Sequence, residues 1–198
     1  MENRAINLKH FAFSILFFLT LFSGCAKSTT LTRVTVNPYL AINSVYTFEN
    51  KTKELSDQLY VDLGADAVWV SLYHPTLPYR IVVTSTSASP GAPQVIRTDT
   101  PDQEYIKSRI IEGGFIYIKV LELPTGTLKD FFRQNKVDHI AAYPIYNRVG
   151  NVEGFIGVRW DEGNYPPSAS KTSSILQAGS DKLKTYNQDL ENYSNYVF

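Results

Sequence analysis

The chain has 198 residues, of which 43% are hydrophobic, 13% aromatic and 19% charged, and these values are typical of a single folded domain. Lys plus Arg and Asp plus Glu each total 19, so the formal net charge is zero. Because nucleic-acid binding depends largely on basic residues that neutralise phosphates, this balance argues against a nucleic-acid partner.

The amino terminus has the organisation of a secretory signal. Residues 1–10 are polar and modestly positive, residues 11–22 are apolar without a charge, and small residues follow. The apolar segment is shorter than the roughly 20 residues that a helix needs to cross a bilayer, although an uncleaved membrane anchor is the alternative. We therefore expect residues 1–24 to be a signal peptide.

Cys25 is the only cysteine in the sequence. The letters LFSGC that end at Cys25 resemble the lipobox of bacterial lipoproteins, with Phe22 where that family prefers Leu. The resemblance implies cleavage before Cys25 and lipidation of its sulfur and new amino group, which together anchor a chain stably at a membrane. Because Ala26 is not the Asp of inner-membrane retention, the resemblance favours the outer membrane facing the periplasm, with the inner membrane as second choice.

Residues 25–42 are expected to form a polar tether, in which Pro38 interrupts any long helix. The folded domain is expected over residues 43–198, beginning with a helix capped by Ser44. Its apolar face recurs every three or four residues, at Phe48, Thr52, Leu55, Leu59 and Leu63. Gly64 then supplies a left-handed stop.

The rest of the domain alternates between strands and short helices. β-branched and aromatic residues predict strands at residues 67–73, 79–86, 115–121, 139–147 and 152–160, with the last two as a hairpin. One short helix is expected after Thr100, with Gln103 completing a capping box, and another is expected from Thr127. This order predicts an α+β domain with helices packed against an antiparallel sheet.

Three stretches resemble the GAF domain, a relative of the PAS sensor fold: LGADAVWV at residues 63–70, AAYPI at 141–145 and GNVEGFIGV at 150–158. The resemblance implies a GAF/PAS-like antiparallel sheet with the N- and C-terminal helices packed on one face. A narrower stretch, YPIYN at residues 143–147, is similar to the periplasmic domain of T-even bacteriophage holins. That family keeps a membrane-spanning helix where we expect this chain to carry a cleavable signal.

Known catalytic constellations are missing from the sequence. The chain has three histidines without H-x-x-x-H spacing, no G-x-S-x-G elbow and no phosphate loop, and its one cysteine is assigned to lipid. The adjacent Asp161 and Glu162 are interpreted as solvated loop residues rather than an acid/base pair. We therefore expect a protein without catalytic activity, metal or cofactor.

The GAF/PAS resemblance implies a ligand site on the sheet face opposite the terminal helices. The candidate residues are Tyr73, Arg80, Val82, Tyr117, Tyr143 and Ile145 on the strands, and Arg97, Tyr105 and Phe131 on the covering segments. The alternative is that these side chains fill a closed core. Gly154 and Gly157 interrupt an otherwise strong strand, which indicates close contact with a neighbouring element or a ligand.

The end of the chain carries an apolar stripe at three- and four-residue steps, at Leu176, Gly179, Leu183, Tyr186, Leu190, Tyr193 and Val197. The stripe predicts either a homodimer seam or a helix that packs on the sheet of its own chain. The expected function is a lipid-anchored module that senses or binds a small ligand. The alternative is a phage-type lysis factor, holin- or antiholin-like, or a superinfection factor that contacts another envelope protein.

Overall fold

The computed structural model describes residues 38–87 and 95–186, with side chains described from Tyr46 onward. The helices are α2 (Pro38–Leu63), α3 (Pro101–Gly113), α4 (Thr127–Gln134) and α5 (Ala169–Lys184), with a 3-10 turn, η1, at Val120–Glu122. The strands are β1 (Ala67–Tyr73), β2 (Tyr79–Ser87), β3 (Val95–Arg97), β4 (Ile116–Lys119), β5 (Val137–Tyr146) and β6 (Val152–Asp161). The signal peptide, Cys25 and most of the expected tether lie outside the described residues.

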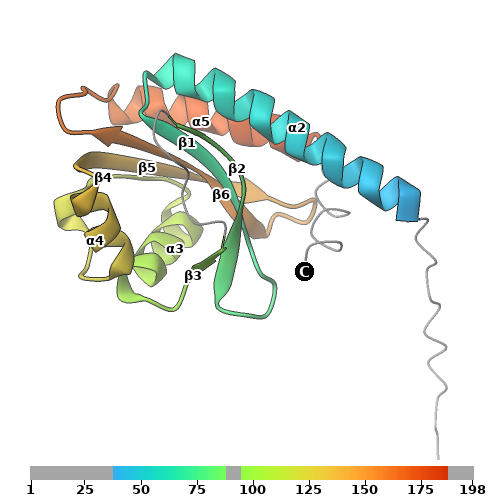
Figure 1. Ribbon diagram of the computed structural model, residues 1–198, viewed down its shortest axis with the longest axis horizontal. Helices are drawn as coiled ribbons and strands as arrows, with labels where there is room; N and C mark the ends of the chain where they lie inside the picture. The colour runs from blue at the N-terminus through green and yellow to red at the C-terminus, as the bar shows by residue number, and fades with distance from the viewer. Residues whose placement is uncertain (1–37, 88–94, 187–198) are drawn as a thin grey trace, which may run out of the picture. The chain divides into compact units, whose positions relative to one another are not determined.

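One six-stranded sheet organises the domain, in the order β3-β2-β1-β6-β5-β4, and every neighbouring pair is antiparallel. The helices α2 and α5 lie together on one face of the sheet, and α3 and α4 cover the other (Figure 1). We call these the α2/α5 face and the α3/α4 face. The predicted α+β class, with both terminal helices on one face of an antiparallel sheet, is confirmed.

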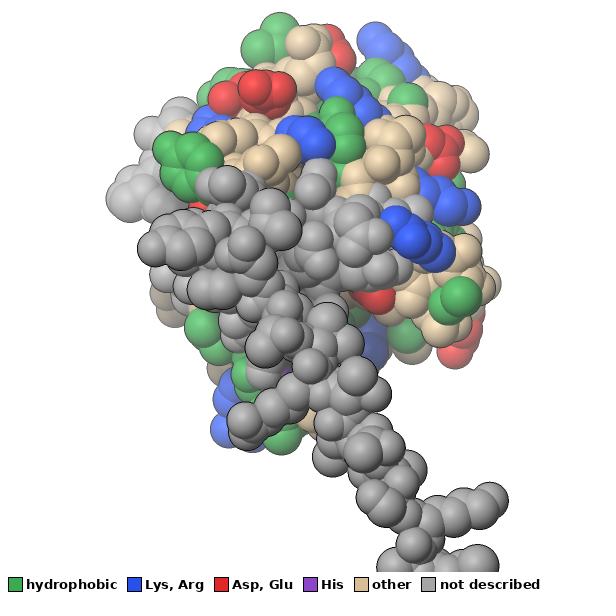
Figure 2. All heavy atoms as spheres, turned by 90° about the vertical axis from the view of Figure 1, so that its right-hand side faces the viewer, with side chains coloured by type: hydrophobic (Ala, Val, Ile, Leu, Met, Phe, Trp, Pro, Cys, Tyr) green, Lys and Arg blue, Asp and Glu red, His purple; other side chains and the backbone are tan. Residues whose placement is uncertain are grey.

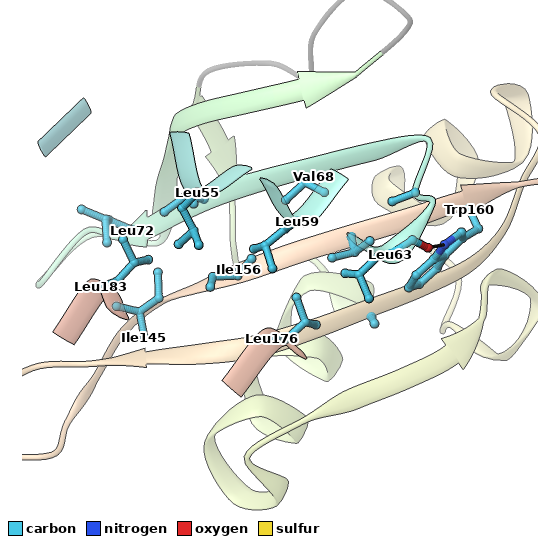
Figure 3. Close-up of a cluster of buried hydrophobic side chains, with 14 of the residues drawn as sticks. Leu55, Leu59, Leu63, Val68, Leu72, Ile145, Ile156, Trp160, Leu176 and Leu183 are labelled. Carbon is cyan, nitrogen blue, oxygen red and sulfur yellow. Dashed lines mark hydrogen bonds between the residues drawn. The ribbon is translucent and has the colours of Figure 1, made fainter. Parts of the chain in front are cut away.

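The apolar face of α2 packs on the sheet as its periodicity predicts. Leu55, Leu59 and Leu63 are almost fully buried against Ile156 and its neighbours on the central strands (Figure 3). The cluster is closed at one end by Trp160, whose indole Nε1 donates a hydrogen bond to the Leu63 carbonyl oxygen at 3.2 Å. Burial of this many aliphatic side chains is the main term that stabilises the domain.

The C-terminal stripe belongs to the same core. Leu176 and Leu183 of α5 have no exposed surface and lie with the α2 leucines (Figure 3). The stripe predicts either a dimer seam or packing on the sheet of its own chain. Leu176 and Leu183 follow the second arrangement. Leu190, Tyr193 and Val197, the remainder of the stripe, lie outside the described residues.

The helix starts differ from their predictions in two places. Helix α2 begins at Pro38, ahead of Ser44, because proline has its φ already set for a first helical turn and no N–H to leave unpaired there. The capping box after Thr100 does not form: the Thr100 hydroxyl donates to Asp102 Oδ1 at 2.6 Å, and Gln103 is buried. The left-handed stop at Gly64 is confirmed, with φ of 53°.

Asp102 ties α3 to the start of α4. The carboxylate is fully buried, and its Oδ2 accepts hydrogen bonds from the backbone N–H groups of Leu128 at 2.7 Å and Lys129 at 2.9 Å. These are two of the donors that a helix leaves unpaired at its N-terminus. Asp102 therefore fixes the position of α4 over the sheet, although it lies on a different helix.

One face of the molecule shows how the charged side chains are distributed. On the face drawn in Figure 2, basic, acidic and hydrophobic side chains are interspersed among the coloured residues. Among the helices that the structure describes, none combines the length and apolar character that a membrane span requires.

Candidate functional site

A cavity of about 290 Å³ lies on the α3/α4 face of the sheet. Strands β1, β2, β3 and β6 form its floor and rim, and α3 and α4 cover it. Its lining residues are Ala67, Trp69, Arg80, Ser85, Ser87, Ile96, Gln103, Thr127, Leu128, Phe131, Phe132 and Arg159. A mainly apolar hollow with a few convergent polar groups is the usual form of a small-molecule site.

Aromatic side chains form the apolar wall of the cavity. The rings of Trp69 and Phe132 are centred 6.5 Å apart, and those of Phe131 and Phe132 are 5.9 Å apart. Trp69 lies directly over Gly157 of the neighbouring strand, where an added Cβ atom would stand 2.2 Å from Cε2 of the indole. Gly157 therefore gives Trp69 room to lie against the sheet. Of the two close contacts that were expected at this glycine, the structure shows the one with a neighbouring element.

Gly154 has a similar explanation. A Cβ atom at this position would stand 2.0 Å from the backbone carbonyl oxygen of Ser71 on β1. The close approach is again between adjacent strands. Gly154 pairs with Ile145 and alternates with Ile156, so it lies on the α2/α5 face, where Tyr143 also packs, and not on the face of the cavity.

Arg80 is the buried charge of the site. Its side chain is 2% exposed, its Nη1 donates to Ser71 Oγ at 2.6 Å, and its Nε donates to Gln103 Oε1 at 3.5 Å. The guanidinium carbon lies 4.8 Å from the centre of the Phe155 ring, an attractive cation–π arrangement. Burial lowers the pKa of Arg80 to about 10, because removal from water disfavours the charged form. Its partners in the described structure are neutral.

Arg159 is held differently. Its Nε lies 3.4 Å from Oδ1 of Asp161, so this arginine has a carboxylate beside it. Burial raises the pKa of Asp161, and the charge of Arg159 opposes that rise. The two arginines of the cavity are therefore unequal, because one is paired with an acid and the other is not.

The cavity brings together two of the predicted ligand residues, Arg80 and Phe131. Tyr73 lies near Arg80, because its ring is centred 5.8 Å from that of Phe155, which contacts the Arg80 guanidinium. Burial raises the pKa of the Tyr73 hydroxyl. Tyr105 packs in the apolar cluster of the same face without lining the cavity. Val82 on β2 is half-buried and also lies outside the lining.

Four of the predicted ligand residues lie elsewhere. Tyr117, Tyr143 and Ile145 pack with the α2/α5 cluster, where Ile145 is fully buried (Figure 3), so their assignment to the ligand face is wrong. Side chains alternate between the two faces of β4 and β5, so the sequence separates them into two sets. Because helices cover both faces of the sheet, the alternation does not show which set meets α3 and α4. Arg97 points to solvent and pairs with Asp99 at 2.6 Å, with 77% of its side chain exposed.

Two further lining residues, Trp69 and Arg159, have features that are visible in the sequence. Trp69 has the same strand parity as Tyr73, and Arg159 interrupts an apolar run on β6 in the way that Arg80 interrupts one on β2. Gln103 is predicted from the sequence to cap α3, so its place in the cavity lining is visible only in the structure. Among the described residues, no group of three or more His, Cys, Asp or Glu side chains is placed to hold a metal ion.

The fold and this covered cavity define a GAF-like domain, and solved structures show the same architecture. The GAF/HD-domain protein of Geobacter sulfurreducens aligns with a TM-score of 0.56 at 17% identity, over 79% of this chain and 99% of that one. The phycoerythrobilin-bound GAF domain of a cyanobacterial phytochrome aligns with a TM-score of 0.58 at 13% identity, over 78% and 97%.

A further match is the GAF domain of Thermosynechococcus elongatus PixJ in its blue-light absorbing form, with a TM-score of 0.57 at 15% identity over 73% and 89% of the two chains. No protein-family model matches the chain, and no curated protein matches its sequence. At these identities the likeness is one of fold, and the predicted GAF-like architecture is confirmed.

Proposed function

We propose that this chain is a lipoprotein of the cell envelope, anchored through Cys25, whose GAF-like domain binds a small molecule in the cavity of the α3/α4 face without chemically changing it. The observation that carries the proposal is the cavity itself, about 290 Å³ in volume, with an aromatic wall and a buried arginine. A pocket of this size is at the lower end of the range for small-ligand sites.

The comparisons support binding as the role of the fold. The cyanobacterial phytochrome domain that aligns with this chain holds phycoerythrobilin, so a GAF domain of this architecture accommodates an organic ligand. The only cysteine of the present chain lies at residue 25, ahead of the domain, so we propose non-covalent binding here. The proposal is therefore a sensing or binding module, and the lysis-factor alternative has no comparable observation in its favour.

Anchoring is tested by substitution of the lipidation residue. In wild-type protein, mass spectrometry should detect a mature chain that begins at a lipid-modified Cys25. Cys25→Ser should leave an uncleaved precursor, because no other cysteine can accept the thioether. An unmodified Cys25 on the full-length wild-type chain would contradict the lipoprotein assignment and favour an uncleaved anchor.

Binding is tested by filling the cavity. Ser85 is half-buried on β2, pairs with Trp69 across the sheet and lines the hollow, so Ser85→Phe places a ring in the space that a ligand would occupy. Phenylalanine is favoured in strands, so the domain should stay folded. A small aromatic probe such as 2-naphthamide should bind the wild-type chain and lose its binding to the variant. Equal binding to both chains would contradict this site.

A further inference from the structure

We propose that the ligand of this cavity has a flat apolar body and an anionic head group that accepts hydrogen bonds, and that Arg80 recognises this head group. The inference rests on the proposed function, because it assigns a chemical class to the ligand of the same cavity. It follows from an excess of hydrogen-bond donors and of positive charge in the lining.

Three lining residues carry hydrogen-bond donors that are unpaired or are paired only with neutral acceptors. Trp69 Nε1 and Gln103 Nε2 are buried and have no hydrogen-bond partner within residues 38–87 and 95–186. Arg80 presents a five-donor guanidinium, and its hydrogen-bond partners among the described residues are one hydroxyl and one amide oxygen. Folded proteins leave few buried donors unpaired, so two of them in the lining of one cavity call for an explanation, and a ligand that accepts hydrogen bonds supplies it.

The charge of the site is equally unbalanced. Among the residues that the structure describes, the cavity lining contains two arginines and no Asp or Glu. Arg159 is matched by Asp161, as described above, whereas Arg80 has no ion-pair partner among the described residues. A buried cation without a partner is costly, and an anion that enters beside it is correspondingly stabilised.

Asp102, a buried acid on the covering helix α3, does not supply that partner. Asp102 already accepts four hydrogen bonds, from the Thr100 hydroxyl and from the backbone N–H groups of Gln103, Leu128 and Lys129. Both of its oxygens are therefore occupied by the cap of α4 and the start of α3. Its negative charge is used to hold the helices, and the charge of Arg80 remains available to a ligand.

A carboxylate or a similar anion matches this site better than a neutral polar group. It accepts hydrogen bonds through two oxygens and brings no donors of its own, so it satisfies a guanidinium without adding unpaired groups. Ser71 and Gln103 hold the guanidinium in place before a ligand arrives, which reduces the entropy lost on binding. The rings of Trp69, Phe131 and Phe132 provide the surface for a flat apolar body.

The test compares two probes of nearly the same shape, 2-naphthoate and 2-naphthamide, by equilibrium dialysis against the full lipidated chain in detergent. Only the first probe is an anion. Wild-type protein should bind 2-naphthoate about 10- to 100-fold more tightly, as expected when hydrogen bonds to a charged group are gained. Equal affinities for the two probes would overturn the proposal.

Substitutions then assign the preference to a residue. Arg80→Met removes the charge while retaining an unbranched side chain, and the two probes should then bind with similar affinity. Arg97→Met is the matched control, because this arginine is exposed and lies outside the cavity lining, and it should leave the preference unchanged. A preference that survives in folded Arg80→Met would overturn the assignment to Arg80.

Because Arg80 is buried, circular dichroism must accompany its variant. If Arg80→Met is unfolded, Trp69→Phe provides the second variant, since it keeps an aromatic ring but removes the Nε1 donor together with part of the indole. The smaller ring should weaken the binding of both probes, and loss of the donor should weaken 2-naphthoate further, so that the ratio of the two affinities falls. An unchanged ratio would count against the donor-rich site.

The Ser85→Phe chain separates the two levels of the account and also supplies the detergent background. If both probes bind equally to wild type and both are lost in Ser85→Phe, the cavity is a binding site but the anionic class is wrong. If neither probe binds, or if Ser85→Phe changes nothing, the proposed function itself fails together with the inference.

Discussion

The contact between β6 and β1 at Gly154 gives a stability prediction whose size follows from the structure. A Cβ atom at residue 154 would stand 2.0 Å from the Ser71 carbonyl oxygen and 3.0 Å from the Leu72 Cα atom. Ordinary contact begins at 3.4 Å, so Gly154→Ala must push the two strands apart by more than about 1 Å at the centre of the sheet. The neighbouring atoms are backbone, so they cannot move aside as a flexible side chain would.

We expect Gly154→Ala to lower the free energy of unfolding by about 1 to 3 kcal/mol, the usual cost of overpacking. For a chain of this size, that corresponds to a fall in Tm of roughly 2 to 12 °C. The assay is thermal and urea denaturation followed by circular dichroism. Gly113→Ala is the matched control: this glycine ends α3, has no atom within 4 Å of an added Cβ, and should be neutral or slightly stabilised. A Gly154→Ala chain as stable as wild type would refute the close-contact explanation.

The remaining predictions concern helix placement and the aromatic wall. Asp102→Ala should destabilise the domain by about 1 to 3 kcal/mol in urea denaturation, because two N-terminal donors of α4 lose their buried acceptor; wild-type stability would contradict its role as a cap. Leu183→Asp should unfold the domain, as followed by circular dichroism, because it buries an unpaired charge, whereas the control Lys184→Asp at an exposed position should stay folded. If light scattering shows that the wild-type chain is a dimer and Leu183→Asp is a folded monomer, the result would instead favour an intermolecular seam. Gly157→Ala should displace Trp69 and weaken both naphthyl probes in dialysis, and unchanged affinities would show that the indole position does not shape the cavity.

Local patterns in the sequence were sufficient for most of the fold. The apolar period of α2 from Phe48 to Leu63, the stop at Gly64 and the strand at Ala67–Tyr73 each depend on neighbours a few residues away, and all three are confirmed. The antiparallel order followed from these elements together with the GAF resemblance. The start of α2 at Pro38 differs from the prediction because proline, which breaks a helix interior, is equally suited to a first helical turn.

The site was harder to predict because it depends on contacts between distant segments. Periodicity separated the two faces of β5 but did not show which face met α3 and α4, so Tyr143 and Ile145 were assigned to the wrong side. Gln103 lies 23 residues from Arg80 and Asp102 lies 26 residues from Leu128, and nothing local indicates either contact. The GAF/PAS resemblance includes Arg80 among the candidates because of its place in the alternation of a strand. Its lack of an acidic partner among the described residues is visible only in the folded chain.

The most direct test of the account is a crystal structure of the chain with 2-naphthoate bound. The account predicts the naphthyl ring against Phe131 and Phe132 in the cavity of the α3/α4 face, with the carboxylate within hydrogen-bond distance of the Arg80 guanidinium. A structure in which the probe lies elsewhere, while this cavity is filled by protein side chains, would contradict it.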